Sequence, residues 1–259
     1  MNLHDIQRHS SDNLRQTYFH LGLAIPNTTL VKEQGFQACL GEFEHPICNF
    51  AAGLNLDPWS TKQLVSLAMS RRAFNVYALP GDEPEHVGEL LHRSDFRVSY
   101  RLAQLVVEPR PGGGGFNMSQ ADGKDARFEV AKFMTEQFFP RQTEGFRRRV
   151  AQATADADGL DLYEFGTTKQ RFGAVMLCQS ENVVGLYNLC VAGPKRGFGL
   201  GKSITKWALS LAEERNKLVT LQCDARIQGW YEEQGFCRTG TVDVYTLSKS
   251  GRSDIMERI

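Results

Sequence analysis

The residues with the clearest chemical potential lie between 191 and 203, in the run Val-Ala-Gly-Pro-Lys-Arg-Gly-Phe-Gly-Leu-Gly-Lys-Ser. Gly197, Gly199 and Gly201 occupy alternate positions, so backbone N–H groups there are unshielded by side chains. The run joins an apolar stretch to one with helical spacing, which places these amides at a helix N-terminus, where anions are favoured. Arg196 and Lys202 add full positive charges. The pattern therefore predicts a site for a phosphate or diphosphate group.

Three phosphate-binding patterns can be compared with this run. A Walker A loop needs a glycine five residues before the glycine of its Gly-Lys-Ser, and the chain has Arg196 there. The dinucleotide pattern GxGxxG fails in both registers, because Lys202 or Ile204 stands where its last glycine is required. The pattern R-x-x-G-x-G is met by Arg196, Gly199 and Gly201. A glycine turn that serves only packing is the alternative.

A second motif follows about 30 residues later, in the run Trp230-Tyr231-Glu232-Glu233-Gln234-Gly235-Phe236. It is similar to a Tyr-x-x-x-Gly-Phe ending. With the glycine run, a strand and a short helix in the same order, it resembles the GCN5-related N-acetyltransferases, the GNAT superfamily. The resemblance covers the C-terminal half of the chain and implies acyl-CoA as donor.

The resemblance also implies roles for particular residues. Backbone groups of the strand before the loop would contact the pantetheine arm, at Leu189, Cys190 and Val191. The diphosphate would be bound by Arg196, Gly197, Phe198, Gly199, Leu200, Gly201 and Lys202. Tyr231 would give a proton to the departing thiolate. The general base stays open between Glu164, Tyr187 and a water chain. Many family members have Asn seven residues before the tyrosine, and Asp224 stands there instead.

Helices and strands alternate in the C-terminal half, which predicts a mixed sheet covered by helices. The strands expected are 116–120, 160–166, 171–179, 182–191, 218–223 and 236–247. The helices expected are 125–139, 141–155, 199–216 and 228–234.

The N-terminal half has a similar order from Phe36 onward, which predicts a faded two-copy repeat. Its expected strands are 36–43, 48–56, 74–79 and 96–107, and its helices 61–72 and 84–93. The run Pro-Arg-Pro-Gly-Gly-Gly-Gly predicts a linker over 109–115. We therefore expect two GNAT-like α/β domains, each a mixed, mostly antiparallel sheet flanked by helices, at 1–108 and 116–259.

The two halves differ where the chemistry is expected. At the position of the loop, the first half has Leu-Asp-Pro-Trp-Ser at 56–60, without glycine. Ser60 and Gln63 fit a capping box, which would satisfy the helix start internally. Leu91 stands opposite Tyr231. The first half is therefore expected to lack both the cofactor loop and the acid, and to shape the acceptor pocket or brace the second half.

Composition limits the partners. Thirty Lys and Arg balance thirty Asp and Glu, which argues against a protein that coats nucleic acid or an anionic membrane. The run Arg147-Arg148-Arg149 is expected to be a solvated helix face. The six cysteines are scattered, so we expect reduced core residues in a cytoplasmic protein. The six histidines all precede residue 93, so no catalytic metal is expected in the second half.

These observations predict an N-acetyltransferase that moves an acetyl group from acetyl-CoA to a primary amine, by direct attack in a ternary complex. The acceptor would be a small molecule or a peptide, with no nucleic acid and no membrane as partner. Whether the chain forms a homodimer is left open. A non-catalytic acyl-CoA sensor on the same fold and a protein-interaction module are the alternatives.

Overall fold

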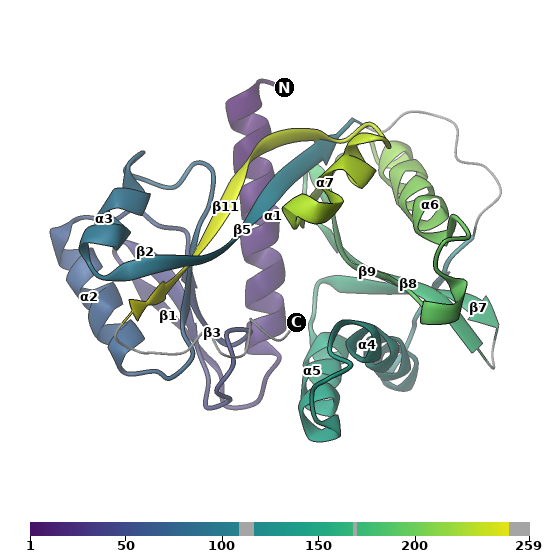
Figure 1. Cartoon of the computed structure of the whole chain (residues 1–259), viewed down its shortest axis with the longest axis horizontal. Coiled ribbons are helices and arrows are strands. Elements are labelled where there is room, and N and C mark those ends of the chain that lie inside the picture. The colour runs from purple at the N-terminus through teal and green to yellow at the C-terminus, as the bar shows by residue number, and fades with distance from the viewer. Residues whose placement is uncertain (109–116, 168–169, 249–259) are drawn as a thin grey trace. The chain divides into compact units, whose positions relative to one another are not determined.

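Helices and strands alternate along the whole chain (Figure 1). The structure is a computed structural model and describes residues 1–108, 117–167 and 170–248. The first elements are α1 (Leu3–Leu23), β1 (Thr29–Glu33), β2 (Phe36–Leu40), β3 (Asn49–Ala52), α2 (Pro58–Met69), β4 (Asn75–Ala78), α3 (Val87–Arg93) and β5 (Phe96–Val107). Then come β6 (Ser119–Gln120), α4 (Lys124–Phe138), α5 (Glu144–Asp156), β7 (Leu160–Thr167), β8 (Gln170–Gln179) and β9 (Val183–Val191). The last are a 3-10 turn (Gly193–Lys195), α6 (Leu200–Glu214), β10 (Leu218–Cys223), α7 (Ala225–Glu232) and β11 (Cys237–Leu247).

The chain forms two compact units that are not continuous in sequence. The first unit contains residues 1–104, 222–228 and, within the described chain, 238–248. The second contains Leu105–Leu221 and Gly229–Cys237. The predicted division at 108 and 116 placed all later residues in one domain, whereas nearly all of β11 packs with the first unit. The predicted linker, 109–115, lies outside the described residues.

The first unit is built on strands in the order β1-β2-β3-β4-β11-β5. The pairs β1–β2 and β2–β3 are antiparallel, and β3–β4 is parallel. The strand β11 lies antiparallel to β4, with Val244 opposite Tyr77. Its Tyr245 and Leu247 belong to the unit's hydrophobic core together with Phe36, Leu64 and Phe96. The last strand of the chain is therefore a structural part of the first unit.

The second unit is built on strands in the order β10-β9-β8-β7-β6, and the end of β5 lies next to β10. Thr220 Oγ1 donates a hydrogen bond to the carbonyl of Leu105, 3.3 Å away. The pair β9–β10 is parallel, and β6–β7, β7–β8 and β8–β9 are antiparallel. Helices α4 and α5 lie on one face of this sheet and α6 on the other (Figure 1). The mixed, mostly antiparallel sheet with helices on its faces matches the prediction.

Helix α1 and strand β1 are elements that the sequence analysis did not predict. The buried residues of α1 include Ser10, Ser11, Asn13 and Thr17. Half of the buried residues of this helix are polar, so its apolar residues do not recur with a clear helical period. The sequence therefore did not predict it. Its start is well defined, because the Asn2 side chain accepts a hydrogen bond from the Asp5 amide at 2.9 Å.

The six cysteines are all unpaired, as predicted. Five are buried, and Cys237 is exposed. No helix in the described parts of the chain combines the length and the apolar character that a membrane span requires.

Candidate active site

The glycine run forms the turn between β9 and α6. Gly197 and Gly199 have φ angles of 83° and 78°, in the left-handed region. Gly199 is the N-cap of α6 and makes no side-chain cap. A residue with a β-carbon pays about 1–2 kcal/mol for this backbone conformation. Two of the three glycines are therefore required by the path of the chain.

The same turn is open to ligand. A β-carbon built on Gly197 or Gly199 would have no heavy atom within 4 Å. Within the described residues, the amides of Gly197 through Lys202 have no hydrogen-bond partner; the first amide of α6 that finds an acceptor is that of Ser203, bonded to Gly199 O at 3.0 Å. A row of unpaired amides at a helix start stabilises an anion by up to about 2 kcal/mol. The packing alternative does not account for Gly197 and Gly199, because no side chain lies against them.

Gly201 differs from the other two glycines. A β-carbon there would lie 3.2 Å from Cζ2 of Trp230 and 4.0 Å from Cδ2 of Leu189. The first turn of α6, the end of β9 and the residue before Tyr231 therefore meet at one point. The sequence analysis placed Leu189, Gly201 and Tyr231 in one site without identifying Trp230 as the side chain between them.

The two cationic side chains of the loop already have partners. Arg196 donates from Nε to the carbonyl of Val191 at 3.0 Å and from Nη2 to Oε1 of Gln137 at 3.4 Å. Lys202 Nζ lies 3.3 Å from Oε2 of Glu233. Both side chains of this ion pair are about half exposed or more, so a diphosphate could replace Glu233 at small cost. Phe198 is 78% exposed.

The strand β9 has the irregularity needed to expose backbone groups. Its register against β8 shifts between Ala174 and Met176, so Tyr187 faces Met176 while Cys190 faces Ala174. This bulge contains Asn188, whose φ is 49°. The parallel ladder with β10 comprises Leu218–Val183, Val219–Val184 and Thr220–Gly185, and the predicted pantetheine residues Leu189 to Val191 lie beyond its last pair.

Alternation along β9 indicates which groups face that edge. Ala192 donates to the carbonyl of Phe172 at 2.9 Å, so it bonds toward β8. Because antiparallel pairing alternates, Cys190 also bonds toward β8, and Val191 presents its backbone groups to the opposite side. Leu189 lies in the bulge, where this alternation is interrupted. The Val191 carbonyl is the group that Arg196 covers.

The thiol of Cys190 is buried. Burial raises the pKa of this thiol to about 12, against smaller lowering contributions from the Ala174 amide and Arg196. A buried thiol with a raised pKa is a poor nucleophile, which disfavours an acyl-cysteine intermediate.

Tyr231 lies in the last turn of α7 and is buried, at 7% exposure. Its ring makes edge contacts with Trp230 at 4.7 Å and with Phe236 at 5.6 Å between centroids. Trp230 thus connects the predicted acid to the predicted phosphate loop.

The candidate bases have different surroundings. Glu164 on β7 is ion-paired with Arg171, which also lies 3.9 Å from Glu129. Tyr187 is buried in β9 opposite Met176. Asp224, at the family's asparagine position, accepts hydrogen bonds from the backbone and side chain of Arg226 at 2.8 Å, and these bonds lower the pKa of its carboxyl. None of these contacts singles out a base.

Comparison with known proteins places this geometry. No protein-family model matches the chain, and no curated protein matches it in sequence. Solved structures do match. A GCN5-related N-acetyltransferase from Kribbella flavida aligns at a TM-score of 0.61 with 14% identity over 90% of this chain and 94% of that one. A putative GNAT-family acetyltransferase from Novosphingobium aromaticivorans aligns at 0.54 with 18% identity, over 84% and 91%.

A third structure matches in both halves. A tandem GNAT protein from the clavulanic acid biosynthesis pathway aligns at a TM-score of 0.59 with 14% identity, over 94% of this chain and 96% of that one. The chain has the tandem GNAT fold. The predicted fold class is thereby confirmed, and the sheet with the glycine turn is its second GNAT-like unit.

The first GNAT-like unit has no comparable turn. Asp57 caps α2: its side chain accepts from the Ser60 amide at 2.7 Å, and Ser60 Oγ accepts from the Asp57 amide at 2.8 Å. The capping box predicted at Ser60 and Gln63 is therefore wrong by one turn. With Pro58 among the first helical residues, the helix begins earlier than expected. The capping box has the predicted effect, because side chains of this unit satisfy the first amides of α2.

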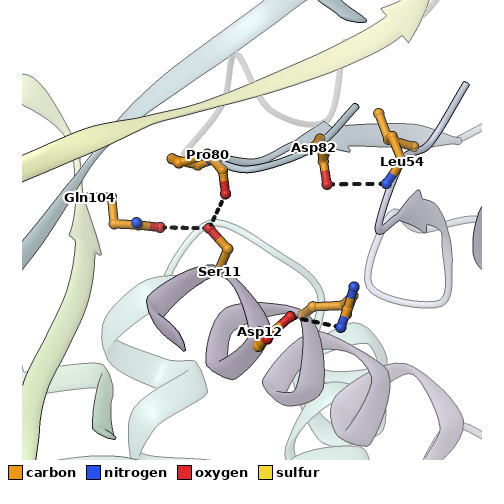
Figure 2. Close-up of polar contacts among 7 residues, drawn as sticks. Ser11, Asp12, Leu54, Pro80, Asp82 and Gln104 are labelled. Atoms are coloured by element: carbon orange, nitrogen blue, oxygen red, sulfur yellow. Dashed lines mark hydrogen bonds and ion pairs between the residues drawn. The ribbon is translucent and has the colours of Figure 1, made fainter. Parts of the chain in front are cut away.

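The gap beyond the parallel strands is also closed in this unit. Past the β3–β4 pairs, the amide of Leu56 bonds to Glu83 O and the amide of Glu83 to Leu54 O, both at 2.9 Å. The carboxylate of Asp82 accepts from the amide of Leu54 at 3.1 Å (Figure 2) and from that of Leu79 at 2.8 Å. The backbone groups that a pantetheine arm would use are thus already paired.

Helix α1 covers the same place. Ser11 Oγ donates to the carbonyl of Pro80 at 2.8 Å and lies 3.5 Å from Gln104 Oε1 (Figure 2). Arg15, paired with Asp12 at 2.7 Å, would stand 2.8 Å from a β-carbon on Gly53. The first GNAT-like unit is closed by its own side chains where the second is open.

Proposed function

We propose that the chain is an acetyl-CoA-dependent N-acetyltransferase whose second unit binds the donor and whose first unit does not. The observation that supports this most is the row of unpartnered amides from Gly197 to Lys202 in open space at the start of α6. Leu189, Cys190 and Val191 would bind the pantetheine arm through backbone groups. Arg196, Gly197, Phe198, Gly199, Leu200, Gly201 and Lys202 would bind the diphosphate.

Acetyl-CoA would supply the acyl group as a thioester. Arg196 and Lys202 would exchange Val191 O and Glu233 for phosphate oxygens, which bind such donors more strongly. Tyr231 would protonate the departing thiolate, and positioned acid help of this kind contributes about 10²–10⁴ in rate. With Cys190 disfavoured as a nucleophile, a primary amine of a small molecule or peptide would attack the thioester directly. As the C–N bond forms and the C–S bond breaks, the amine nitrogen would lose a proton to Glu164, Tyr187 or a water chain.

A non-catalytic acyl-CoA sensor is the second candidate, favoured by the burial of Tyr231 at 7% exposure. Both candidates require donor binding, and only the enzyme releases CoA.

Two measurements test these candidates. Calorimetry with acetyl-CoA should give one site per chain, and absence of binding would reject both. Release of free CoA thiol should then rise when members of an amine panel are added. If acetyl-CoA binds tightly but no amine raises the rate of CoA release above the rate without amine, the non-catalytic sensor is the supported function.

A further inference from the structure

The first unit has a pocket of about 500 Å³ between α3, β5 and β11. Its lining is Gly88, Glu89, His92, Arg93, Arg97, Val98, Arg101 and Tyr245. We infer that this pocket is a binding site for a small anion whose charged group is a phosphate or a carboxylate.

Three guanidinium groups carry the argument. Arg97 and Arg101 are four residues apart on β5, so they project from the same face of the strand. Arg101 Nε bonds to Asp243 at 2.9 Å, and Arg93 lies 3.5 Å from Glu89. The Arg93–Glu89 pair is largely exposed and weak, and in the other pair Arg101 is 65% exposed and Asp243 25%.

Arg97 is different from the other two. Its Nη1 donates to the carbonyls of His92 at 3.0 Å and Phe96 at 2.8 Å, which fixes the guanidinium. Among the described residues it has no carboxylate partner. Three of its five N–H donors, on Nε and Nη2, therefore remain, and its planar fork matches an oxyanion.

Tyr245 contributes a neutral donor. Its ring is buried, at 5% exposure, and its hydroxyl makes no hydrogen bond with any described residue. A β-carbon on Gly88 would stand 2.7 Å from that hydroxyl oxygen. The absence of a side chain at residue 88 thus leaves room for the hydroxyl at the pocket wall.

The lining favours an anion over other ligands. It presents three arginines and a hydroxyl; Glu89 pairs with Arg93 and Asp243 with Arg101, which leaves the guanidinium of Arg97 in excess. A cation would be repelled by Arg97, which has no carboxylate partner among the described residues. The site shares no residue with the loop at 197–202, so this inference is independent of the proposed function.

The test is titration of the full chain with inorganic phosphate, a sugar phosphate monoester and citrate, each against sodium chloride at matched ionic strength. Calorimetry gives the affinity, and the rise in melting temperature gives an independent measure. Arg97→Ala and Tyr245→Phe alter the pocket. Arg72→Ala is the matched control, an 83% exposed arginine of the same unit paired at the surface with Glu44.

We expect Arg97→Ala to weaken binding at least about tenfold, the loss of one charged hydrogen-bonding group. Tyr245→Phe should weaken it several-fold, and Arg72→Ala should leave it unchanged. Binding of phosphate compounds alone, or of citrate alone, would support the site and assign its group. If no anion binds, or if Arg97→Ala binds as tightly as the parent chain, the inference is wrong. Phosphate bound at the loop of residues 197–202 would bind Arg97→Ala as tightly as the parent chain. The effect of Arg97→Ala therefore distinguishes the two sites.

Discussion

Gly201 and Trp230 are in van der Waals contact across the candidate site, with only 3.2 Å between the place of a β-carbon on residue 201 and Cζ2 of the indole. Because Trp230 precedes Tyr231, this contact sets the separation between the phosphate loop and the predicted acid. Gly201 therefore lies in a packed position, whereas Gly197 and Gly199 border open space.

Gly201→Val should displace Trp230 and destabilise the protein by about 1–3 kcal/mol, the usual cost of overpacking. Thermal unfolding measures this directly. Gly145→Val is the matched control, since Gly145 is in a helix and has open space around its β-carbon position. Equal melting temperatures for the two variants would show that the indole can move aside.

Gly199→Glu should abolish acetyl-CoA binding, because a carboxylate would stand against the diphosphate. Gly123→Glu is the control for the strain of a side chain at positive φ. Gly123 is also a helix N-cap in open space, with φ of 81°. We expect both variants to lose similar stability and only Gly199→Glu to lose binding in calorimetry. Retained affinity would mean that the loop does not hold the cofactor.

Tyr231→Phe should lower kcat by about 10²–10⁴ and change KM little, because the hydroxyl acts on the leaving thiolate and the ring contacts remain. Steady-state release of CoA measures both constants. Tyr163→Phe, which removes a hydroxyl 3.4 Å from Gln120 elsewhere in the same unit, is the control. Unchanged kinetics in the Tyr231 variant would assign that residue to packing alone.

Glu233→Gln should strengthen acetyl-CoA binding about two- to threefold, because Lys202 would be released from an ion pair of less than about 1 kcal/mol. The effect should shrink as salt is raised. Lys202→Ala should weaken binding and remove the effect of the Glu233 substitution. An equal gain from Glu233→Gln in the Lys202→Ala background would show that the pair plays no part.

Asp82 should give the first unit a pH-dependent stability. Burial raises the pKa of its carboxyl to about 7, against lowering by the Leu79 and Leu54 amides and by Arg15, with a small further rise from Asp12. The folded chain therefore binds a proton that the unfolded chain, with an ordinary Asp pKa near 3.9, does not. The stabilisation is present below about pH 4 and is lost as the pH rises through about 7.

Melting temperatures from pH 4 to 8 test this. The parent chain should lose more stability across that range than Asp82→Asn, whose side chain does not titrate. Glu85→Gln, at an exposed position nearby, should follow the parent curve. Parallel curves for the parent chain and Asp82→Asn would contradict the prediction.

The sequence predicts the fold class, whereas the place of β11 differs from the predicted division, and the roles of the site residues stay predictions. Glycines 197 and 199 could be recognised because positive φ and open amides are local requirements of one turn. Trp230 could not, since its contact with Gly201 joins residues far apart in sequence. Helix α1 was not predicted because serine, asparagine and threonine form half of its buried residues. The capping box was predicted at Ser60 and Gln63, whereas the structure forms it three residues earlier, at Asp57 and Ser60. Both pairs have the same spacing, and the sequence alone does not choose between them.

The position of β11 was the least predictable feature, because the apolar residues of a strand do not indicate which other strand it pairs with. Its consequence concerns how such a protein can be divided. Cutting the polypeptide at residue 113 would leave each fragment without a strand that the other encodes. We therefore expect neither half to complete its own sheet without the other.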